Sequence, residues 1–446
     1  MKKLLTLTTI ILLVAAVMFS LVACVENDEQ LLAKYSKQIE QEMKGSFDFF
    51  WNEAQTYENS PAYGLISDRA GGTKDSAASI ASVGFGLAAY VIGAEEGYVT
   101  REQAEERTLG TLQTLRNLQL GGGTAVFEGF FTHFLNKTNA QPVSGSEISS
   151  IDTAIMLCGA LTAGEYFGGE IEELANEIYA AVNWKAMQMT RNGKHYIAMT
   201  VNNNGTPITP WDYYAEQLMI YVLGAGSPTE AYRLDDTEYY DFTRSKGNYG
   251  GHSFYYSWFG SIFTYQFSHA FVDFRNKVDK NGTNWWNNSV EASLASYQYS
   301  KDNASKSKTF AGGGWGLTAC DVPNGYSGHL GTPPRGWTPD EDYGKIEGTV
   351  APCGAIGSVV FTPKQSLQAL NYYQTDSKVR FINGKYGLLD AYNLDRNWYG
   401  LDYIGIDKGI SLLMLYNYKC GGVWNLFMAN GYVQNGMEVL GFTAEQ

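Results

Sequence analysis

Apolar and aromatic residues recur at helical spacing along most of this chain, and glycine-bearing turns separate the stretches that carry them. Apolar positions three and four residues apart place one continuous stripe on a helix, as a core-packing helix requires. Around Thr100, a threonine followed three residues later by glutamine is typical of a capped helix N-terminus. The pattern predicts about twelve helices, over residues 39–54, 76–97, 100–119, 146–166, 170–184, 214–224, 259–274, 284–299, 354–361, 363–373, 406–418 and 423–430.

Several of these helices are small or apolar all round, which favours helices that pack on both sides. Residues 76–97 are the clearest example, because small residues alternate there with large apolar ones. A closed ring of helical hairpins, an (α/α)6 toroid, supplies such inner positions within one domain. We therefore predict an all-α fold of this kind. Long loops such as residues 312–348 would lie at one mouth, and residues 195–201 would form a small β-hairpin on the cleft rim.

The first two dozen residues have the pattern of a targeting segment. Two lysines precede an apolar run that ends in Leu-Val-Ala-Cys at residues 21–24. This resembles a bacterial lipoprotein signal, which is cleaved before the cysteine and acylated on its thiol; an uncleaved membrane anchor is the alternative. We predict a signal peptide at residues 1–23, a lipidated Cys24 with a tether to residue 35, and one domain over residues 36–446. The protein would be exported and held at the outer membrane, on its periplasmic face or at the cell surface.

The formal net charge of the chain is −14 and its pI is about 4.9. Such a chain lacks the basic surface that nucleic acid or anionic lipid requires. Aromatic residues make up 14% of the chain and tyrosine leads them with 31. Tyrosine offers both a ring face and a hydroxyl, which suits a sugar. We expect a monomer that binds a neutral oligo- or polysaccharide and meets the membrane only through its lipid.

The remaining cysteines are Cys158, Cys320, Cys353 and Cys420, and none has the spacing of a zinc ligand pair. We predict no metal and no cofactor. One disulfide stays open as an alternative, since the sequence does not choose a pair.

Residues 249–275 (YGGHSFYYSWFGSIFTYQFSHAFVDFR) are crowded with aromatic side chains and contain few aliphatic ones. Flat aromatic faces beside fixed polar groups suit a ligand with apolar faces and hydroxyl edges, such as a sugar. An aromatic-rich buried helix with satisfied histidines is the structural alternative. The sugar-contacting candidates from this stretch and from two other aromatic segments are His269, Asp273, Arg275, Tyr265, Trp211 and Trp398.

Acidic residues beside apolar or glycine-rich neighbours are the candidates for catalysis. Hydrolysis of a glycosidic bond usually needs two carboxyls, one to donate a proton and one to activate water or attack directly. Burial raises the pKa of a carboxyl toward the working range. For each candidate, a helix cap, a turn or a buried hydrogen bond is the alternative role. The candidates are Glu147, Asp152, Glu216, Asp321, Asp402 and Asp407.

A series of ordered motifs is spread over most of the chain after the leader. They are GLISDR (64–69), ASIASVGFGLAAY (78–90), GFFTHFLN (129–136), SSIDTAIMLCGAL (149–161), AEQLMIYVLGAGSP (215–228), SHAFVDFR (268–275), GWGLTACD (314–321) and GIDKGI (405–410). Together they resemble the glucoamylase-like family that includes glycoside hydrolase family 144, the bacterial β-1,2-glucanases and β-1,2-oligoglucan hydrolases.

This resemblance implies a single (α/α)6 barrel and an inverting hydrolase without a metal. Glu216 matches the family's candidate proton donor, and the water-activating base should lie among Glu147, Asp152 and Asp407. The polar positions matched around the sugar site are His133, Asp273, Arg275 and Asp321. Two motifs depart from the family pattern, because Asp-Gln-Gly-Pro is Asp-Lys-Gly-Ile at residues 407–410 and Ser-Asp-Gly-Pro is Cys-Asp-Val-Pro at residues 320–323. These departures leave subsite shape and endo or exo action open.

The prediction is a lipid-anchored glycoside hydrolase that cleaves β-glucan or its oligosaccharides, with β-1,2 linkage as the first choice. A non-catalytic glycan-binding lipoprotein is the first alternative. A polysaccharide lyase is the second, although it would need a basic cleft for an acidic polysaccharide and this chain is acidic. The sequence contains neither a Gly-x-Ser-x-Gly nucleophile motif nor a P-loop.

Overall fold

The computed structural model describes residues 26–72, 77–337 and 348–445. The chain divides into two compact units, residues 1–36 and residues 37–446. The described part of the first unit starts the helix α2 (Asp28–Asn52), and the rest of α2 belongs to the second. The predicted signal peptide and Cys24 lie outside the described residues, as does part of the predicted loop at 312–348.

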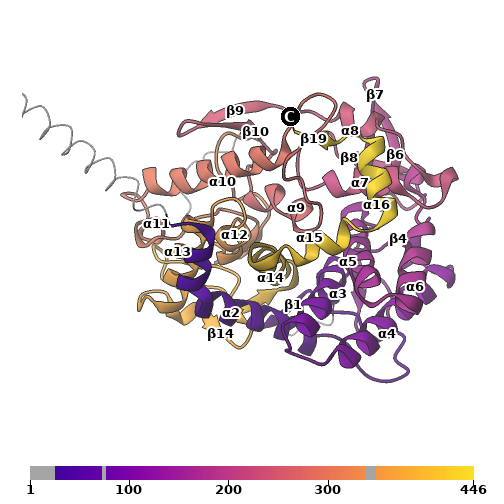
Figure 1. Ribbon diagram of the computed structural model, residues 1–446, viewed down its shortest axis with the longest axis horizontal. Coiled ribbons are helices and arrows are strands. Elements are labelled where there is room, and N and C mark those ends of the chain that lie inside the picture. Colours follow the sequence, from indigo (N-terminus) through magenta and orange to yellow (C-terminus); the bar gives the residue numbers. More distant parts are fainter. Residues whose placement is uncertain (1–25, 73–76, 338–347, 446) are drawn as a thin grey trace, which may run out of the picture. The chain divides into compact units, whose positions relative to one another are not determined.

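Within residues 37–446, five of the described helices contact one another in a closed ring, and a sixth packs against it (Figure 1). Neighbours contact one another in the order α14, α3, α5, α7 and α9; α9 contacts α14 again, and α12 also packs on α14. The predicted all-α ring is therefore confirmed. The inner helices are α3 (Ile80–Glu95), α5 (Ser150–Phe167), α7 (Leu218–Gly226), α9 (Phe267–Phe271), α12 (Pro352–Ile356) and α14 (Gly405–Cys420).

A second set of helices packs outside this ring. In α4 the buried positions are spaced three or four residues apart, as an amphipathic helix requires. The longer outer helices are α2, α4 (Arg101–Leu120), α6 (Gly169–Ala180), α10 (Trp285–Asp302), α13 (Pro363–Thr375) and α16 (Gly431–Val439). The shorter helices are α8 (Thr237–Asp241), α11 (Lys308–Gly312), α15 (Gly422–Phe427), η1 (Trp184–Met187), η2 (Glu230–Tyr232), η3 (Ile262–Tyr265) and η4 (Arg380–Ile382).

The small residues of the inner helices let two backbones touch. A Cβ atom placed on Gly159 of α5 would lie 1.9 Å from the carbonyl oxygen of Gly84 in α3. No side chain fits at that distance, so the close packing of α3 on α5 requires glycine at this position. This contact explains why both segments are rich in small residues.

Short antiparallel strands connect the helices. One sheet has three strands in the order β6-β7-β8, and the others described have two. The predicted β structure at residues 195–201 is confirmed, because it forms β7 of the three-stranded sheet. The strands are β1 (Arg69–Gly71), β2 (Ala77–Ser79), β3 (Val126–Phe127), β4 (Phe130–Phe131), β5 (Phe134–Asn136), β6 (Gln188–Arg191), β7 (Lys194–Val201), β8 (Pro207–Pro210), β9 (Lys246–Tyr249), β10 (His252–Tyr255), β11 (Lys277–Val278), β12 (Cys320–Val322), β13 (Gly325–Ser327), β14 (Asn383–Gly384), β15 (Gly387–Leu388), β16 (Tyr392–Asn393), β17 (Trp398–Tyr399), β18 (Asp402–Ile404) and β19 (Thr443–Ala444).

The predicted helix over residues 259–274 is wrong. That segment contains only η3 and the five-residue α9, and an irregular loop precedes them. Gly260 has a positive φ of 69°, and a Cβ there would lie 2.1 Å from the carbonyl oxygen of Thr332. Contact with a segment far along the chain therefore sets this backbone, and the local aromatic pattern does not reveal it.

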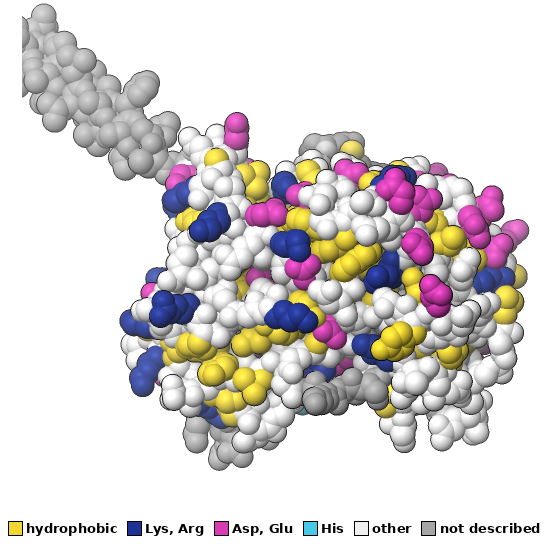
Figure 2. Space-filling view, turned by 90° about the horizontal axis from the view of Figure 1, so that it is seen from below, with side chains coloured by type: hydrophobic (Ala, Val, Ile, Leu, Met, Phe, Trp, Pro, Cys, Tyr) yellow, Lys and Arg dark blue, Asp and Glu magenta, His cyan; other side chains and the backbone are white. Residues whose placement is uncertain are grey.

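No helix in the described part of the chain is long and apolar enough to cross a membrane. On the face drawn in Figure 2, lysine and arginine side chains are interspersed with aspartate and glutamate. Basic side chains therefore do not gather into one patch on this face.

Candidate active site

A cleft of about 780 Å³ opens where the segments before α7 and around η3 meet the loop at residues 319–328. A volume of this size suits an oligosaccharide segment. Aromatic rings line it together with hydroxyl groups, and all but Trp211 and Tyr214 are exposed or half-buried, so the cleft presents both ring faces and polar edges. The aromatic lining residues are Trp211, Tyr213, Tyr214, Trp258, Phe259, Phe263 and Tyr326.

Glu216 lines this cleft just before the start of α7. Its carbonyl oxygen accepts a hydrogen bond of 2.5 Å from Ser268 Oγ, which fixes the turn into the helix. Burial raises the pKa of Glu216 to about 7, and the negative charge of Asp152 adds to the rise. A carboxyl of this kind keeps its proton near neutral pH and can act as a general acid.

Asp152, His133 and Glu147 form one cluster beside Glu216. His133 Nδ1 lies 2.9 Å from Glu147 Oε1, and His133 Nε2 lies 3.5 Å from Asp152 Oδ1. Burial raises the pKa of Asp152, against the lowering effect of His133 and Ser149. The hydrogen bond from His133 lowers the pKa of Glu147, which is more exposed. Of the two acids, Asp152 therefore lies deeper and is the one coupled to Glu216.

A second cluster centres on Arg69 in β1. Its Nη1 lies 3.2 Å from Asp321 Oδ1 and 3.5 Å from Asp402 Oδ2. The antiparallel pairing of β1 with β18 sets this geometry, since it places Gly71 opposite Asp402. Arg69 also pairs with Asp68, whose charge acts on His133. Asp68 and Arg69 therefore connect the two acidic clusters.

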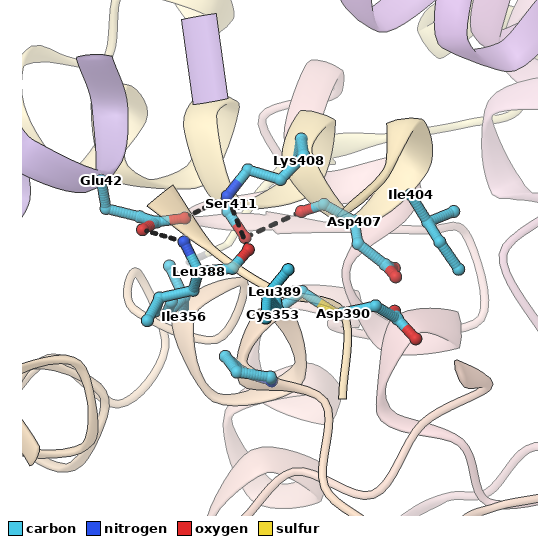
Figure 3. A pocket seen from close by; sticks show the side chains of 11 residues that line it. Glu42, Cys353, Ile356, Leu388, Leu389, Asp390, Ile404, Asp407, Lys408 and Ser411 are labelled. Atoms are coloured by element: carbon cyan, nitrogen blue, oxygen red, sulfur yellow. Dashed lines mark hydrogen bonds and ion pairs between the residues drawn. The ribbon is translucent and has the colours of Figure 1, made fainter. Parts of the chain in front are cut away.

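Asp407 lies in the first turn of α14, beside Asp390 in a small cavity (Figure 3). Asp390 Oδ2 accepts a 2.7 Å hydrogen bond from the backbone N–H of Asp321, which joins this pair to the Arg69 cluster. Partial desolvation and then the charges of Asp407 and Asp390 raise the pKa of Tyr326, which lines the cleft. The pair therefore lies next to the cleft that holds Glu216.

Lys408, which stands where the family pattern has glutamine, is buried beneath the pair of Asp390 and Asp407. Lys408 is 3% exposed and forms an ion pair with Glu42 of α2, which is 1% exposed. Glu42 Oε2 also accepts the backbone N–H of Leu388 at 3.0 Å, and Lys408 Nζ donates to the carbonyl oxygen of Leu388 at 3.3 Å. The lysine therefore points away from the cleft and into the junction of α2, α14 and β15.

The aromatic candidates occupy different positions. Trp211 lines the cleft, and its Nε1 donates a 3.0 Å hydrogen bond to Ser150 Oγ. Tyr265 lies behind the wall, where its hydroxyl accepts the backbone N–H of Ser257 at 2.9 Å. Trp398 is half-buried in the β16–β17 hairpin and does not line the cleft. Of the three, Trp211 alone has a ring in the cleft wall.

His269, Asp273 and Arg275 do not join the cleft. His269 lies in the core, where its Nε2 is 2.9 Å from Ser289 Oγ and its carbonyl oxygen accepts Trp424 Nε1 at 2.6 Å. Burial lowers the pKa of His269 to about 3, so the ring is neutral. Arg275 pairs with Asp273 at 2.8 Å, and its guanidinium lies 4.2 Å from the Trp424 ring centre. These contacts brace α9 and α15, and none of the three residues lines the cleft that holds Glu216.

The residue patterns in the sequence did not single out Asp390, and they assigned no role to Arg69. Asp390 is an acid inside the apolar run GLLDAYNL at residues 387–394, which is the same signal that selected Glu216. Arg69 lies in the GLISDR motif, but its partners Asp321 and Asp402 are hundreds of residues away. Only the fold brings these charges together.

Among the described residues, no group of three or more histidine, cysteine or acidic side chains is arranged to hold a metal ion. Among the described residues, Cys158, Cys320, Cys353 and Cys420 form no disulfide with one another.

One family model matches half of the chain. It is named Glycoamylase, is described as "Putative glucoamylase", and covers residues 209–431. The matched range contains both Glu216 and Asp407.

A curated relative is the exo β-1,2-glucooligosaccharide sophorohydrolase (non-reducing end) of Parabacteroides distasonis. It is 26% identical over 458 residues, which cover 92% of this chain and 58% of that protein. The chain therefore spans a little over half the length of this relative.

Two solved structures have the same fold. The endo-β-1,2-glucanase from Chitinophaga pinensis, in complex with sophorotriose and glucose, has a TM-score of 0.78 at 26% identity, over 92% of this chain and 99% of that one. The β-1,2-glucanase from Parabacteroides distasonis has a TM-score of 0.78 at 24% identity, over 94% of this chain and 60% of that one.

Proposed function

The chain belongs to the glucoamylase-like family, and from that membership we propose that it is a glycoside hydrolase of β-1,2-linked glucan or its oligosaccharides. Two similar proteins of known name act on β-1,2-linked glucose chains, one as an exo and one as an endo enzyme. The sizes of the products distinguish exo from endo action.

Glu216 carries the proposal. It is a carboxyl with a pKa of about 7 in a cleft lined by aromatic rings, so it holds a proton near neutral pH where a sugar would bind. We assign Glu216 as the general acid that protonates the leaving oxygen, directly or through a substrate hydroxyl. The aromatic rings of Trp211, Trp258 and Tyr326 would stack on the sugar faces.

We assign Asp407 as the base that activates water. It lies at the start of α14, on the side of the cleft marked by Tyr326, while Glu216 lies on the side of α7. Inversion would require the two carboxyls to stand about 6.5–9.5 Å apart, with the attacking water between them and the sugar. Asp152 would tune Glu216 through its charge, and Glu147 would hold His133.

A panel of linear glucans of different linkage tests this function. The wild-type protein should release new reducing ends from the β-1,2-linked chain, with product sizes followed over time. E216Q and D407N should each lower kcat on the order of 10²-fold or more while binding persists. E177Q, which changes an exposed glutamate paired with Arg116, is the matched control and should keep full activity. Binding without any new reducing ends in the wild type would identify a glycan-binding protein instead.

We also propose that the chain is exported and lipid-anchored through Cys24, on the basis of its leader sequence. Labelled palmitate should enter the wild-type protein and not C24A, and the wild type should fractionate with membranes. Labelling of C24A to the same extent would contradict the assignment.

A further inference from the structure

Two carboxylate oxygens beside the proposed active site lack a hydrogen-bond donor. They are Asp390 Oδ1 and Asp407 Oδ2, each buried with no partner among the described protein groups. The two residues are 3% and 8% exposed. Figure 3 draws their carboxyl groups next to each other, pointing to the same side of the cavity. An unsatisfied buried oxygen is costly, so two neighbouring ones need a common explanation.

One proton between the two oxygens satisfies both of them. The cavity beside the pair measures about 10 Å³, room for one water at most, and the two carboxyls lie next to each other. The second oxygen of Asp390 already accepts the N–H of Asp321 at 2.7 Å. Two ionised carboxylates in contact in such a place would repel each other strongly.

We propose that Asp390 is a positioning residue that stays protonated and donates a hydrogen bond from Oδ1 to Oδ2 of Asp407, holding Asp407 as an oriented carboxylate. The inference rests on the proposed function only in naming Asp407 as the base. It adds a residue that touches no substrate and acts through Asp407.

The surroundings place the proton on Asp390. Asp407 lies at the N-terminus of the sixteen-residue helix α14, next to the cation of Lys408, and both favour its charged form. The charge of Asp321 acts on both acids, and Asp390 has the charge of Asp407 beside it in addition. The other titratable groups around the pair are Cys320 of β12, Tyr326 of β13, Cys353 of α12 and Glu42 of α2.

The pKa directions agree with this placement. Burial raises the pKa of both acids, and the hydrogen bond with Asp407 raises that of Asp390 further. For Asp407, hydrogen bonds with Asp390 and Cys353 oppose the effect of burial.

A clamp of three residues holds the two carboxyls in register. Leu388 lies two residues before Asp390, and Lys408 directly follows Asp407. Glu42 accepts the N–H of Leu388 and pairs with Lys408, while Lys408 donates to the carbonyl oxygen of Leu388 (Figure 3). The clamp therefore fixes the backbone of each carboxyl relative to the other, and it uses the lysine that departs from the family's glutamine.

Two substitutions of Asp390 distinguish a protonated Asp390 that donates a hydrogen bond from an ionised Asp390. D390N keeps an N–H donor for Asp407 and an oxygen for Asp321, so it should retain kcat/KM within about threefold. D390L removes the donor and keeps the site dry, so it should lower kcat on the order of 10–100-fold and move the acid limb of the pH profile to higher pH. D395N, on the same loop with its carboxylate bonded to Ser307 and Lys308, is the control and should behave as wild type.

Two results would overturn the inference. One is a D390N variant as inactive as D407N. The other is an acid limb that moves to lower pH in folded D390L, which would mean that a negative charge had been removed.

An infrared measurement tests the proton without relying on activity. In an E216Q background, the difference spectrum between this protein and E216Q/D390N at pH 7 should show the loss of one carbonyl stretch of a protonated carboxyl. Persistence of that stretch after D390N would refute the assignment. Failure of every variant and of the wild type to hydrolyse any glucan would instead count against the proposed function alone.

Discussion

Ser149 both caps α5 and donates a 2.5 Å hydrogen bond from its Oγ to Asp152 Oδ2. The same Oγ accepts the backbone N–H of Asp152 at 3.2 Å, so one hydroxyl serves the helix terminus and the buried acid together. Asp152 is in turn the charge that acts on Glu216. The residue that caps α5 therefore also affects the electrostatics of the proposed active site.

S149A should destabilise the protein by about 1–2 kcal/mol, because the helix loses its cap and a buried carboxylate loses a donor. Urea denaturation followed by circular dichroism measures this change in the free energy of unfolding. S149T keeps the hydroxyl and should stay within about 0.5 kcal/mol of the wild type. Equal loss in both variants would mean that packing, and not the hydroxyl, matters at this position.

The alkaline limb of the kcat/KM profile should have its midpoint at about 7, because Glu216 must carry a proton to act as the acid. D152N removes a negative charge that helps to raise the pKa of Glu216, so the midpoint should move to lower pH. Initial rates between about pH 5 and pH 9 measure the shift, and residual activity is sufficient for it. A midpoint that moves to higher pH in D152N would contradict the coupling of these two acids.

His133 should stabilise the protein more in acid than in alkali. Burial alone would lower the pKa of His133, but Asp152 and then Glu147 raise it overall above its ordinary value. A raised pKa means that the folded state binds the proton more tightly. Its stabilising effect is complete below about pH 6.5 and is lost as the pH rises through the folded-state pKa. The loss of unfolding free energy in H133Q should be larger at about pH 5.5 than at about pH 9, and a loss independent of pH would indicate packing alone.

The buried pair of Lys408 and Glu42 should show strong coupling. K408M leaves the Glu42 carboxylate buried without its cation and should lower the free energy of unfolding by about 3–5 kcal/mol. The double variant E42Q/K408Q keeps neutral hydrogen-bonding groups. It should therefore lower the free energy of unfolding less than K408M does, although it carries two changes. Chemical denaturation of E42Q, K408Q and E42Q/K408Q closes the double-mutant cycle. Additive losses would show that the two side chains do not act as a pair.

Much of the fold follows from local pattern. The spacing of apolar residues predicted α4, α5, α10, α13 and α14 with ends close to those observed. The Thr100 signal is a complete capping box, in which Thr100 and Gln103 each bond the other's backbone. Such features depend on residues within one or two turns, so the sequence displays them directly.

The aromatic stretch at residues 249–275 shows where local pattern fails. It divides into the β9–β10 hairpin, a loop and two short helices; part of it lines the cleft, while His269 and the Asp273–Arg275 pair pack elsewhere. The same residue types serve both purposes. Only contacts with distant segments, such as Gly260 on Thr332, separate a sugar-facing ring from a core ring.

The sequence by itself determined the helical ring, the caps and a short set of acids, because periodicity, capping and apolar context are properties of neighbouring residues. The tertiary structure alone decided how those acids act. Glu216 acquires its raised pKa from burial and from Asp152, and Asp407 meets Asp390 through a clamp that joins α2, β15 and α14. Desolvation and charge coupling depend on distances in space, and residues far apart in the chain set those distances.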